Sequence, residues 1–323
     1  MKIIPLQAMR PVLADKAAIR DAVSNALIAH SRGDVQHPSP TQMLFHDETE
    51  ALRGDCHIKS AYAESLPYFT VKVATGFYSN NSRGLPVNNG MVLVMSSETG
   101  EPKMLLQDEG WITASRTAAA GVLAMSIRDR EGEFTLGVLG TGLQARLQAA
   151  WAIALLPVSH VVIWGRSTER AQHLQVTLAK DHPEARCDVV NDVGALANRA
   201  DVIVTTTPSV QPLLMVEHIQ AHHHIVAVGA DSPGKQELDS KVLAIADRIV
   251  TDDHSQCLAH GEFGAAVRAG VVENDVDVSL GSVLAGEVLT NRTNGPTVVD
   301  LTGLGVQDLA VASLMMERLS TQQ

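Results

Sequence analysis

The sequence has few aromatic residues and no basic cluster, and each shortage excludes a class of partner. Phe, Trp and Tyr make up 3% of the 323 residues, too few for a platform on which the bases of single strands stack. The formal net charge is -11, whereas binding to a phosphate backbone requires a basic surface. Nucleic acid is therefore not an expected partner.

Cysteines and long apolar runs are also scarce. Cys56, Cys187 and Cys257 are widely spaced and form no CxxC pair, so the sequence predicts reduced thiols rather than a disulfide framework or a metal site. The N-terminus has no apolar stretch of the signal-peptide type. No run approaches the roughly 18 apolar residues of a membrane span. We expect a cytoplasmic protein that binds no metal and no membrane.

A glycine motif between two apolar runs is the most informative feature that the sequence does contain. The motif GTGLQA at 140–145 follows the run 134–139 and leads into an Ala/Leu-rich stretch. Gly140 permits a tight turn, and Gly142 lets a pyrophosphate approach the backbone. The helix that begins near Leu143 and Gln144 then offers free N–H groups to the phosphates. This pattern predicts a dinucleotide site, with a glycine turn that binds nothing as the alternative.

The end of the second apolar run selects between the two nicotinamide cofactors. In such a unit, an Asp or Glu at this point bonds the ribose 2′-OH of NAD, whereas an Arg receives the 2′-phosphate of NADP. This chain has Arg166 and Ser167 there and no acid. The sequence predicts NADP(H) as the preferred cofactor, with NAD(H) as the alternative.

Apolar and helical segments alternate from the glycine motif to about residue 250. This alternation indicates a parallel sheet with crossover helices, the Rossmann type of α/β domain. Expected strands are 134–139, 160–164, 187–190, 201–206, 225–229 and 248–251, and expected helices are 142–155, 168–180, 193–199, 215–221 and 239–245.

The first hundred residues have a different pattern. A helical stripe within 11–30 precedes strand-like runs at 57–61, 68–77, 91–95 and 103–107. Segments 281–292 and 305–320 are helical again, and the last is expected to return to the N-terminal half. The predicted fold class is α/β, with a Rossmann-type parallel-sheet domain plus an α+β domain with antiparallel β. The expected boundaries are 1–117 plus 302–323 for the α+β domain and 118–301 for the Rossmann domain.

Two cations occupy unusual positions. Lys72 lies in the middle of the apolar run 68–77, where burial of a lysine is costly, so an outward-facing side chain is the simpler interpretation of this residue alone. Thr113 or Ser115 is a candidate cap of a small-residue helix, which would place Arg116 in the first turn. A cation there opposes the helix dipole unless an anion binds at the same point. Arg116 is therefore a candidate anion ligand.

Asp231 follows the expected strand 225–229, at the carboxyl end where ligands bind in parallel sheets. A carboxyl group there can exchange a proton with a substrate nitrogen, and a turn cap in Asp-Ser-Pro-Gly is the alternative. His222, His223 and His224 cannot all face one metal from a helix or a strand, and we expect them in a solvated turn.

These residues together resemble the ornithine cyclodeaminase/mu-crystallin family. The resemblance covers nearly the whole chain. Its motifs are TVKVATGFYSNN around Lys72, ITASRTAAAG around Arg116, the glycine motif, VGADSPGKQELD around Asp231 and GLGVQDLA around Asp308. It implies chemistry on the C=N or C–N bond of an α-imino or α-amino acid beside the nicotinamide. It also implies a homodimer in which the N-terminal domains, which bind substrate, pair into a closed barrel.

The resemblance implies roles for the candidate residues. Lys72 and Arg116 are expected to hold the substrate carboxylate, and Asp231 and Lys72 are the expected catalytic residues. The expected cofactor-binding residues are Gly140, Gly142, Leu143, Gln144, Arg166, Ser167, Thr206, Thr207, Arg116, Thr117 and Gly229.

Two positions depart from the family pattern. Gln42 stands nearest to an arginine that many members use as a third carboxylate ligand, and His57 stands where the ornithine-cyclising members have a glutamate. Both are expected to bind substrate, and Lys59 is a candidate for the missing cation. With Arg166, these departures favour an NADPH-dependent reductase of α-imino acids such as Δ1-pyrroline-2-carboxylate or Δ1-piperideine-2-carboxylate. The alternatives are an ornithine cyclodeaminase, another NAD(P)-dependent amino-acid dehydrogenase, and a non-catalytic protein that binds the cofactor.

Overall fold

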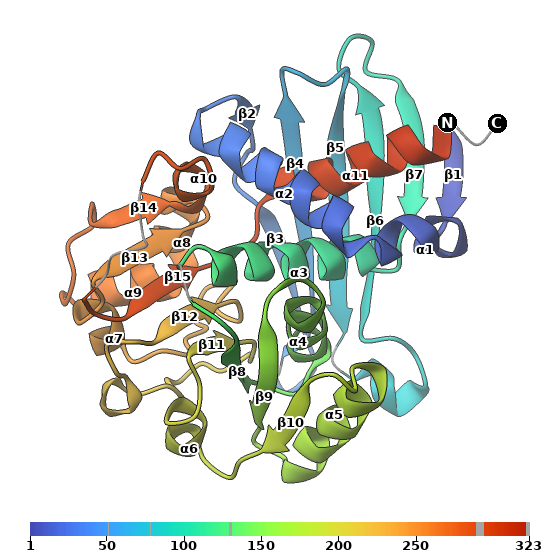
Figure 1. The fold of residues 1–323 in the computed structure, drawn as a ribbon. Coiled ribbons are helices and arrows are strands. Elements are labelled where there is room, and N and C mark those ends of the chain that lie inside the picture. The colour runs from blue at the N-terminus through green and yellow to red at the C-terminus, as the bar shows by residue number, and fades with distance from the viewer. Residues whose placement is uncertain (51, 78, 129–130, 289–293, 321–323) are drawn as a thin grey trace. The chain divides into compact units, whose positions relative to one another are not determined.

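The computed structural model describes residues 1–50, 52–77, 79–128, 131–288 and 294–320 (Figure 1). The chain divides into two compact units, each with a sheet of its own. The first unit combines Met1–Arg116 with Leu304–Gln323, and the second consists of Thr117–Gly303. No helix among the described residues is both long enough and apolar enough to cross a membrane.

The first unit contains two N-terminal helices, seven strands, one short 3-10 helix and the C-terminal helix. Its elements are β1 (Lys2–Pro5), α1 (Leu6–Ala14), α2 (Lys16–Ser31), β2 (Val35–Gln36), β3 (Thr41–His46), β4 (Leu52–Ala63), β5 (Tyr68–Phe77), η1 (Asn80–Arg83), β6 (Asn88–Ser96), β7 (Pro102–Gln107) and α11 (Gly305–Ser320). The helix α3 (Trp111–Ser126) begins in the first unit and ends in the second.

The seven strands form a mostly antiparallel sheet in the order β1-β7-β6-β5-β4-β2, with β3 also paired to β4. Only the pairing of β1 with β7 is parallel among those described. In β5, Thr70 and Lys72 are buried, whereas Val71 and Val73 are partly exposed, which is the period of two expected for a strand with one covered face. The expected antiparallel half is thus confirmed.

The helix α11 covers the buried face of this sheet. It packs against β4, β5 and β6 and also against α2, so the C-terminal segment does return to the N-terminal half, as expected (Figure 1). The close approach depends on Gly305, because a Cβ at this position would lie 2.6 Å from the Ser60 carbonyl oxygen. This contact brings the first turn of α11 onto the strand that pairs with β5.

The opposite face of the sheet carries a stripe of apolar side chains that remain partly or largely exposed. Cross-strand partners on an antiparallel sheet share a face, so the registers of β1 through β7 place these residues together. They are Ile3, Met43, Ile58, Val71, Val73, Met91, Leu93 and Leu105. An apolar sheet face of this size is typical of a surface that another layer covers.

The second unit alternates strands and helices. Its elements are β8 (Phe134–Leu139), α4 (Leu143–Leu155), β9 (Val158–Trp164), α5 (Thr168–Asp181), β10 (Arg186–Val189), α6 (Val193–Ala197), β11 (Val202–Thr205), η2 (Val216–His218), β12 (His224–Ala227), α7 (Ser240–Ala244), β13 (Arg248–Thr251), α8 (His254–His260), α9 (Glu262–Arg268), β14 (Asp277–Ser279), α10 (Leu280–Leu284) and β15 (Thr297–Asp300).

The eight strands of the second unit are all parallel, in the order β10-β9-β8-β11-β12-β15-β13-β14. The chain runs outward from β8 to β9 and β10, and it then returns to place β11 on the other side of β8. Ligands of such sheets bind outside the carboxyl ends of the strands at this switch point. The expected Rossmann-type sheet is confirmed, and with the antiparallel sheet of the first unit the fold class is α/β.

Several details of the second unit differ from expectation. β15 lies between β12 and β13 but was not expected, because a strand of four residues is too short a run to stand out in the sequence. The helix expected at 215–221 is only the single turn η2. The helix expected at 281–292 is the short α10, and residues 289–292 lie outside the described residues.

His222 lies in an exposed turn, as expected, but the expectation is wrong for the other two histidines. His223 and His224 are fully buried. The His223 ring bonds the Gln220 N–H and the Ala197 carbonyl, and the His224 ring lies 2.5 Å from Thr297 Oγ1 and 2.7 Å from the Ala124 carbonyl oxygen. The two rings thus tie α3, α6 and the neighbouring strand to β12, which the sequence around them did not indicate.

Candidate functional site

Three charged side chains meet inside the first unit. Lys72 Nζ lies 2.8 Å from Asp308 Oδ2, and Arg116 Nε lies 3.3 Å from Asp308 Oδ1. The side chains of Lys72, Arg116 and Asp308 are 2%, 7% and 0% exposed. Because two cations share one carboxylate, this cluster can take up a further anion such as a substrate carboxylate.

Three elements bring these groups together. Lys72 lies in the middle of β5 on the covered face, Arg116 lies on α3, and Asp308 lies in the first turn of α11. A negative charge is favoured at that end of a helix by the backbone dipoles. The Gln307 amide, one residue before Asp308, accepts a hydrogen bond of 3.0 Å from Arg116 Nη1 through Oε1. The first turn of α11 therefore holds the guanidinium by two neighbouring side chains.

The charged groups of the cluster shift one another's pKa values. Burial alone would raise the pKa of Asp308, but the ammonium of Lys72 and the guanidinium of Arg116 bring it below its ordinary value. Burial lowers the pKa of Lys72, and Asp308 opposes this effect. Burial also raises the pKa of nearby Asp108, and the hydrogen bond from the Ile112 N–H opposes it. The two cations therefore favour the charged form of Asp308.

The expected start of the α3 helix is wrong. The helix begins at Trp111 rather than after Thr113 or Ser115, because buried Asp108 accepts a 2.8 Å hydrogen bond from the Ile112 N–H through Oδ2. Arg116 is consequently the sixth residue of the helix, and the opposition to the helix dipole that the sequence suggested does not arise. What makes Arg116 unusual is its burial beside Asp308.

Further polar groups lie on the same face of the sheet. Lys59 is directly opposite Lys72 in the β4–β5 pairing, is buried, and helps to lower the pKa of Asp308. Gln42 is directly opposite His57 in the β3–β4 pairing, and Gln42 Nε2 lies 3.3 Å from His57 Nε2. Since side chains two residues apart share a face, His57 and Lys59 lie on one side of β4. The two departures from the family pattern are therefore direct neighbours.

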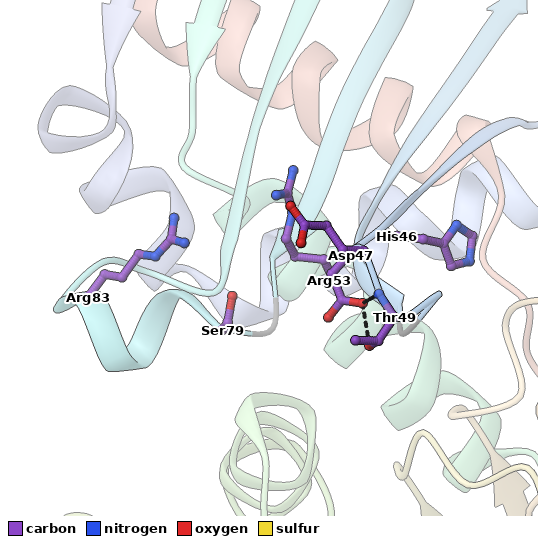
Figure 2. A pocket seen from close by; sticks show the side chains of 7 residues that line it. His46, Asp47, Thr49, Arg53, Ser79 and Arg83 are labelled. Atoms are coloured by element: carbon purple, nitrogen blue, oxygen red, sulfur yellow. Dashed lines mark hydrogen bonds between the residues drawn. The ribbon is translucent and has the colours of Figure 1, made fainter.

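A hollow of about 800 Å³ opens elsewhere on the first unit. Figure 2 shows Ser79 and Arg83 on the side of η1, and Asp47, Thr49 and Arg53 on the side of the β3–β4 hairpin. Asp47 Oδ1 accepts hydrogen bonds from the N–H and the hydroxyl of Thr49. None of the predicted substrate residues lines this hollow, so the buried cluster remains the candidate substrate site.

The glycine turn of the second unit has room for a ligand beside its backbone. Gly140 has φ 133°, a conformation that side chains rarely adopt, and a Cβ there would collide with Thr206 Oγ1. A Cβ on Gly142, by contrast, would meet no protein atom within 4 Å. The helix α4 begins at Leu143, and its N-cap, Gly142, supplies no side-chain bond to the N–H groups of residues such as Leu143 and Gln144. This geometry fits a pyrophosphate.

The end of β9 presents an arginine. Arg166 is exposed, two residues after β9 ends at Trp164. Ser167 caps α5 by accepting a 3.3 Å hydrogen bond from the Arg170 N–H. A Cβ at Gly165 would collide with Thr141 Cγ2, so the end of β9 touches the glycine turn. The carboxyl edge of the sheet thus has a cation and no acid at the point where a ribose would lie.

Thr206, Thr207 and Gly229 follow β11 and β12 at the same edge, whereas Thr117 lies on α3. The N–H and the hydroxyl of Thr206 donate to the Leu139 carbonyl, at the end of β8. The Thr207 and Gly229 N–H groups, after β11 and β12, both donate to Glu237. At the start of the unit, the Thr117 carbonyl accepts from Gln148, a buried residue of α4.

Asp231 follows β12 by four residues and belongs to the second unit. Its side chain is 47% exposed, and its Oδ1 lies 2.7 Å from Lys235 Nζ and accepts a 3.1 Å bond from the Ser232 hydroxyl. The carboxylate is therefore ion-paired near the carboxyl edge of the parallel sheet.

Three residues that organise these sites have no role among the predictions made from the sequence. Asp308 and Gln307 hold Arg116, and Glu237 holds the segments after β11 and β12. A signal for Asp308 exists in the sequence: it is a lone acid within the apolar stretch GLGVQDLAVASLMM. A buried acid in such a stretch requires a cationic partner, but the sequence does not say which one.

A model of the ornithine cyclodeaminase/mu-crystallin family matches residues 9–323. An uncharacterized cyclodeaminase of Sinorhizobium fredii is 38% identical over 82% of this chain and 81% of its own length. The iminosuccinate reductase of Paracoccus denitrificans is 35% identical over 76% of this chain and 75% of its own. A Δ1-pyrroline-2-carboxylate reductase of Bacillus cereus is 31% identical over 87% of this chain and 85% of its own.

Solved structures resemble the whole chain. The iminosuccinate reductase of Paracoccus denitrificans in complex with NAD+ superposes with a TM-score of 0.87 at 28% identity, covering 100% of this chain and 97% of that one. An archaeal alanine dehydrogenase dimer with bound NAD superposes with a TM-score of 0.88 at 29% identity and the same coverage.

Proposed function

The chain belongs to the ornithine cyclodeaminase/mu-crystallin family, and we propose that it is an NADPH-dependent reductase that converts an α-imino acid into the amino acid. As a member it is an NAD(P)-dependent enzyme. Relatives named as reductases of imino acids, at 35% and 31% identity, support the reductive direction. Candidate substrates are cyclic ketimines such as Δ1-pyrroline-2-carboxylate and Δ1-piperideine-2-carboxylate.

The observation that carries the proposal is the composition of the covered face of the first sheet. Buried Lys72 and Arg116 share Asp308 and leave cationic capacity for one carboxylate. Gln42 on β3 and His57 on β4 lie 3.3 Å apart. Gln42 stands nearest to an arginine of many members, and His57 stands where the ornithine-cyclising members have a glutamate. The acid that those members have at this place is thus replaced by an imidazole.

Each residue has a part in the proposed reaction. Lys72 and Arg116 bind the substrate carboxylate, which fixes the imine carbon in one orientation. The reduced nicotinamide supplies the hydride when it is bound. Asp231 already pairs with the ammonium of Lys235, so its carboxylate is suited to stabilise a protonated imine nitrogen.

The activity test is oxidation of NADPH in the presence of a panel of α-imino acids, including both cyclic ketimines and iminosuccinate. We expect turnover of at least one cyclic ketimine and a large loss of kcat in Asp231→Asn. Lys72→Met should raise KM for the imino acid. The assignment of Asp231 is refuted if Asp231→Asn keeps full activity, and the reductase itself is refuted if no imino acid is reduced.

The cofactor preference is a separate part of the proposal. Arg166 is exposed at the end of β9, and no acid stands beside it to repel a 2′-phosphate. The solved relatives described above hold NAD, so the preference for NADP(H) depends on Arg166 in this chain. Dissociation constants for NADPH and NADH, measured by fluorescence titration, test it, and tighter binding of NADH would contradict it.

A cyclodeaminase or an amino-acid dehydrogenase is the second candidate. A relative named as a cyclodeaminase is 38% identical, and the archaeal structure at 29% identity is an alanine dehydrogenase. Ammonia release from ornithine without net cofactor turnover would identify a cyclodeaminase. Reduction of NAD(P)+ with alanine would identify a dehydrogenase. A protein that binds NADPH tightly but converts none of these substrates would be a non-catalytic binding protein.

We also propose that two chains associate through the apolar face of the first sheet. Its partly or largely exposed side chains, among them Val73, Met91 and Leu93, form a stripe that a second copy can cover. Light scattering should give the mass of two chains. Val73→Glu should give one chain, whereas Val176→Glu, a change of the same kind at an exposed valine of α5, should leave the dimer intact. Equal masses for both variants would contradict this interface.

A further inference from the structure

Glu237 is buried and bonded to both strand-end segments at the carboxyl edge of the parallel sheet. Its Oε2 accepts a hydrogen bond of 2.6 Å from the hydroxyl of Thr205, the last residue of β11. The same oxygen accepts a hydrogen bond of 2.8 Å from the N–H of Gly229, two residues after β12. Its Oε1 accepts a hydrogen bond of 2.5 Å from the N–H of Thr207, two residues after β11. One carboxylate therefore joins the ends of two neighbouring strands.

The backbone of Glu237 is itself held on two sides. Its N–H donates to Glu262 Oε1 at 2.6 Å, and the Leu238 N–H donates to Glu262 Oε2 at 3.2 Å. Its carbonyl accepts from the N–H groups of Leu213 and Leu214. The backbone of Glu237 is thus fixed by hydrogen bonds, and a movement of the carboxylate alone would break the three hydrogen bonds that it accepts.

The segments after β11 and β12 are also in close steric contact. A Cβ at Gly229 would collide with the Thr207 carbonyl and with Glu237 itself. All three bonds to Glu237 come from N–H or O–H donors, so they fit the carboxylate form. Burial raises the pKa of Glu237 to about 7 although each of these bonds opposes the rise. Burying a carboxylate costs free energy, and apolar packing could hold two segments together without this cost. We therefore expect Glu237 to have a role beyond packing.

We propose that Glu237 is a positioning residue that clamps the ends of β11 and β12 and thereby sets the backbone on which the nicotinamide half of the dinucleotide rests. The glycine turn after β8 suits the pyrophosphate, and the end of β9 suits the adenosine half. The other half then lies over the strands on the opposite side of β8, which are β11 and β12. The proposal rests on this placement of the cofactor and not on the identity of the imino acid.

The test compares Glu237→Gln with Asp300→Asn. Both changes replace a fully buried acid by its amide, but the Asp300 side chain accepts from the Phe263 N–H of α9 rather than from the segments after β11 and β12. We expect both variants to melt at lower temperature. Only Glu237→Gln should raise the dissociation constant of NADPH, by about tenfold, and speed amide exchange in peptides that contain Thr207 and Gly229.

Thr205→Val gives a milder version of the test, since it removes one donor to Glu237 and keeps the shape of the side chain. It should weaken NADPH binding by a smaller factor, with the imino-acid KM unchanged. The proposal is overturned if Glu237→Gln and Thr205→Val bind NADPH as the parent does, or if Asp300→Asn weakens binding equally. NADPH binding is measured without a substrate. The effect of Glu237→Gln on NADPH binding can therefore be interpreted even if the chain reduces no imino acid.

Discussion

Replacing Asp308 by asparagine tests whether the buried cluster is energetically coupled. The carboxylate pairs with Lys72 at 2.8 Å and with Arg116 at 3.3 Å, and it is fully buried. The amide of asparagine keeps the size of the side chain but removes the charge. Lys72 and Arg116 would then lose the carboxylate that they share, and Gln307 would still bond the guanidinium. Removal of one partner of a buried pair leaves an uncompensated charge, which typically costs about 3–5 kcal/mol.

The chain can escape part of this cost by releasing the proton of Lys72. For a lysine with the ordinary pKa of 10.5, the free energy of deprotonation is about 5 kcal/mol at pH 7 and about 2 kcal/mol at pH 9. The destabilisation by Asp308→Asn should therefore lie near 3–5 kcal/mol at pH 7 and fall toward about 2 kcal/mol at pH 9. Burial already lowers the pKa of Lys72, and this acts in the same direction.

Urea unfolding followed by circular dichroism, at pH 7 and pH 9, measures both values. Glu101→Gln is the matched control, because it removes the same charge from a solvent-exposed pair with Lys103 and should change the free energy of unfolding far less. In a double-mutant cycle, Lys72→Met should reduce the cost of Asp308→Asn by at least about 1 kcal/mol. A cost near that of the control, no decrease at pH 9, or additive effects in the cycle would refute the reasoning.

Three further outcomes are expected. Gly142→Ala should fold with the stability of the parent, because its Cβ meets no protein atom, yet raise the Kd for NADPH about tenfold or more, whereas Gly140→Ala should fail to fold stably because of its φ of 133°. Arg166→Asp should shift the ratio of kcat/KM from NADPH toward NADH by about 10- to 100-fold, the value of a lost charge-assisted bond, and an unchanged ratio would remove Arg166 from the cofactor site. Burial lowers the pKa of His223 from 6.5 to about 4, so its contribution to stability is complete above pH 6.5 and is lost as pH falls toward 4. The difference in unfolding free energy between the parent and His223→Gln should shrink by up to about 3 kcal/mol over that interval, and a constant difference would contradict the assignment.

Features encoded by neighbouring residues could be predicted from the sequence. The glycine turn, α4 and the strands on either side of it lie within one stretch of about 30 residues, and the local periodicity and the glycines specify them. The same holds for β5, whose residues 68–77 agree with the expected strand. Such segments are predictable because backbone propensity, turn chemistry and the alternation of apolar residues act over a few positions.

Features that depend on distant residues could not be predicted. The period of two in β5 puts Lys72 and Val73 on opposite faces, but it does not say which face is covered. The helix α11 decides this, because it approaches β4 at Gly305 and so buries Lys72 rather than the valine. In the same way, β15 enters the parallel sheet between β12 and β13 although its four residues give a weak signal.

The sequence by itself determined that the chain has a dinucleotide turn, a parallel sheet around it, an antiparallel half, and an arginine where a second-strand acid would select NAD. Only the tertiary structure decided that Asp308 joins Lys72 and Arg116 and that Glu237 joins the ends of β11 and β12. Arg116 and Asp308 are 192 residues apart in the chain. No local pattern records such a pairing, because a buried charge finds its partner only when the packing of distant elements excludes water from both.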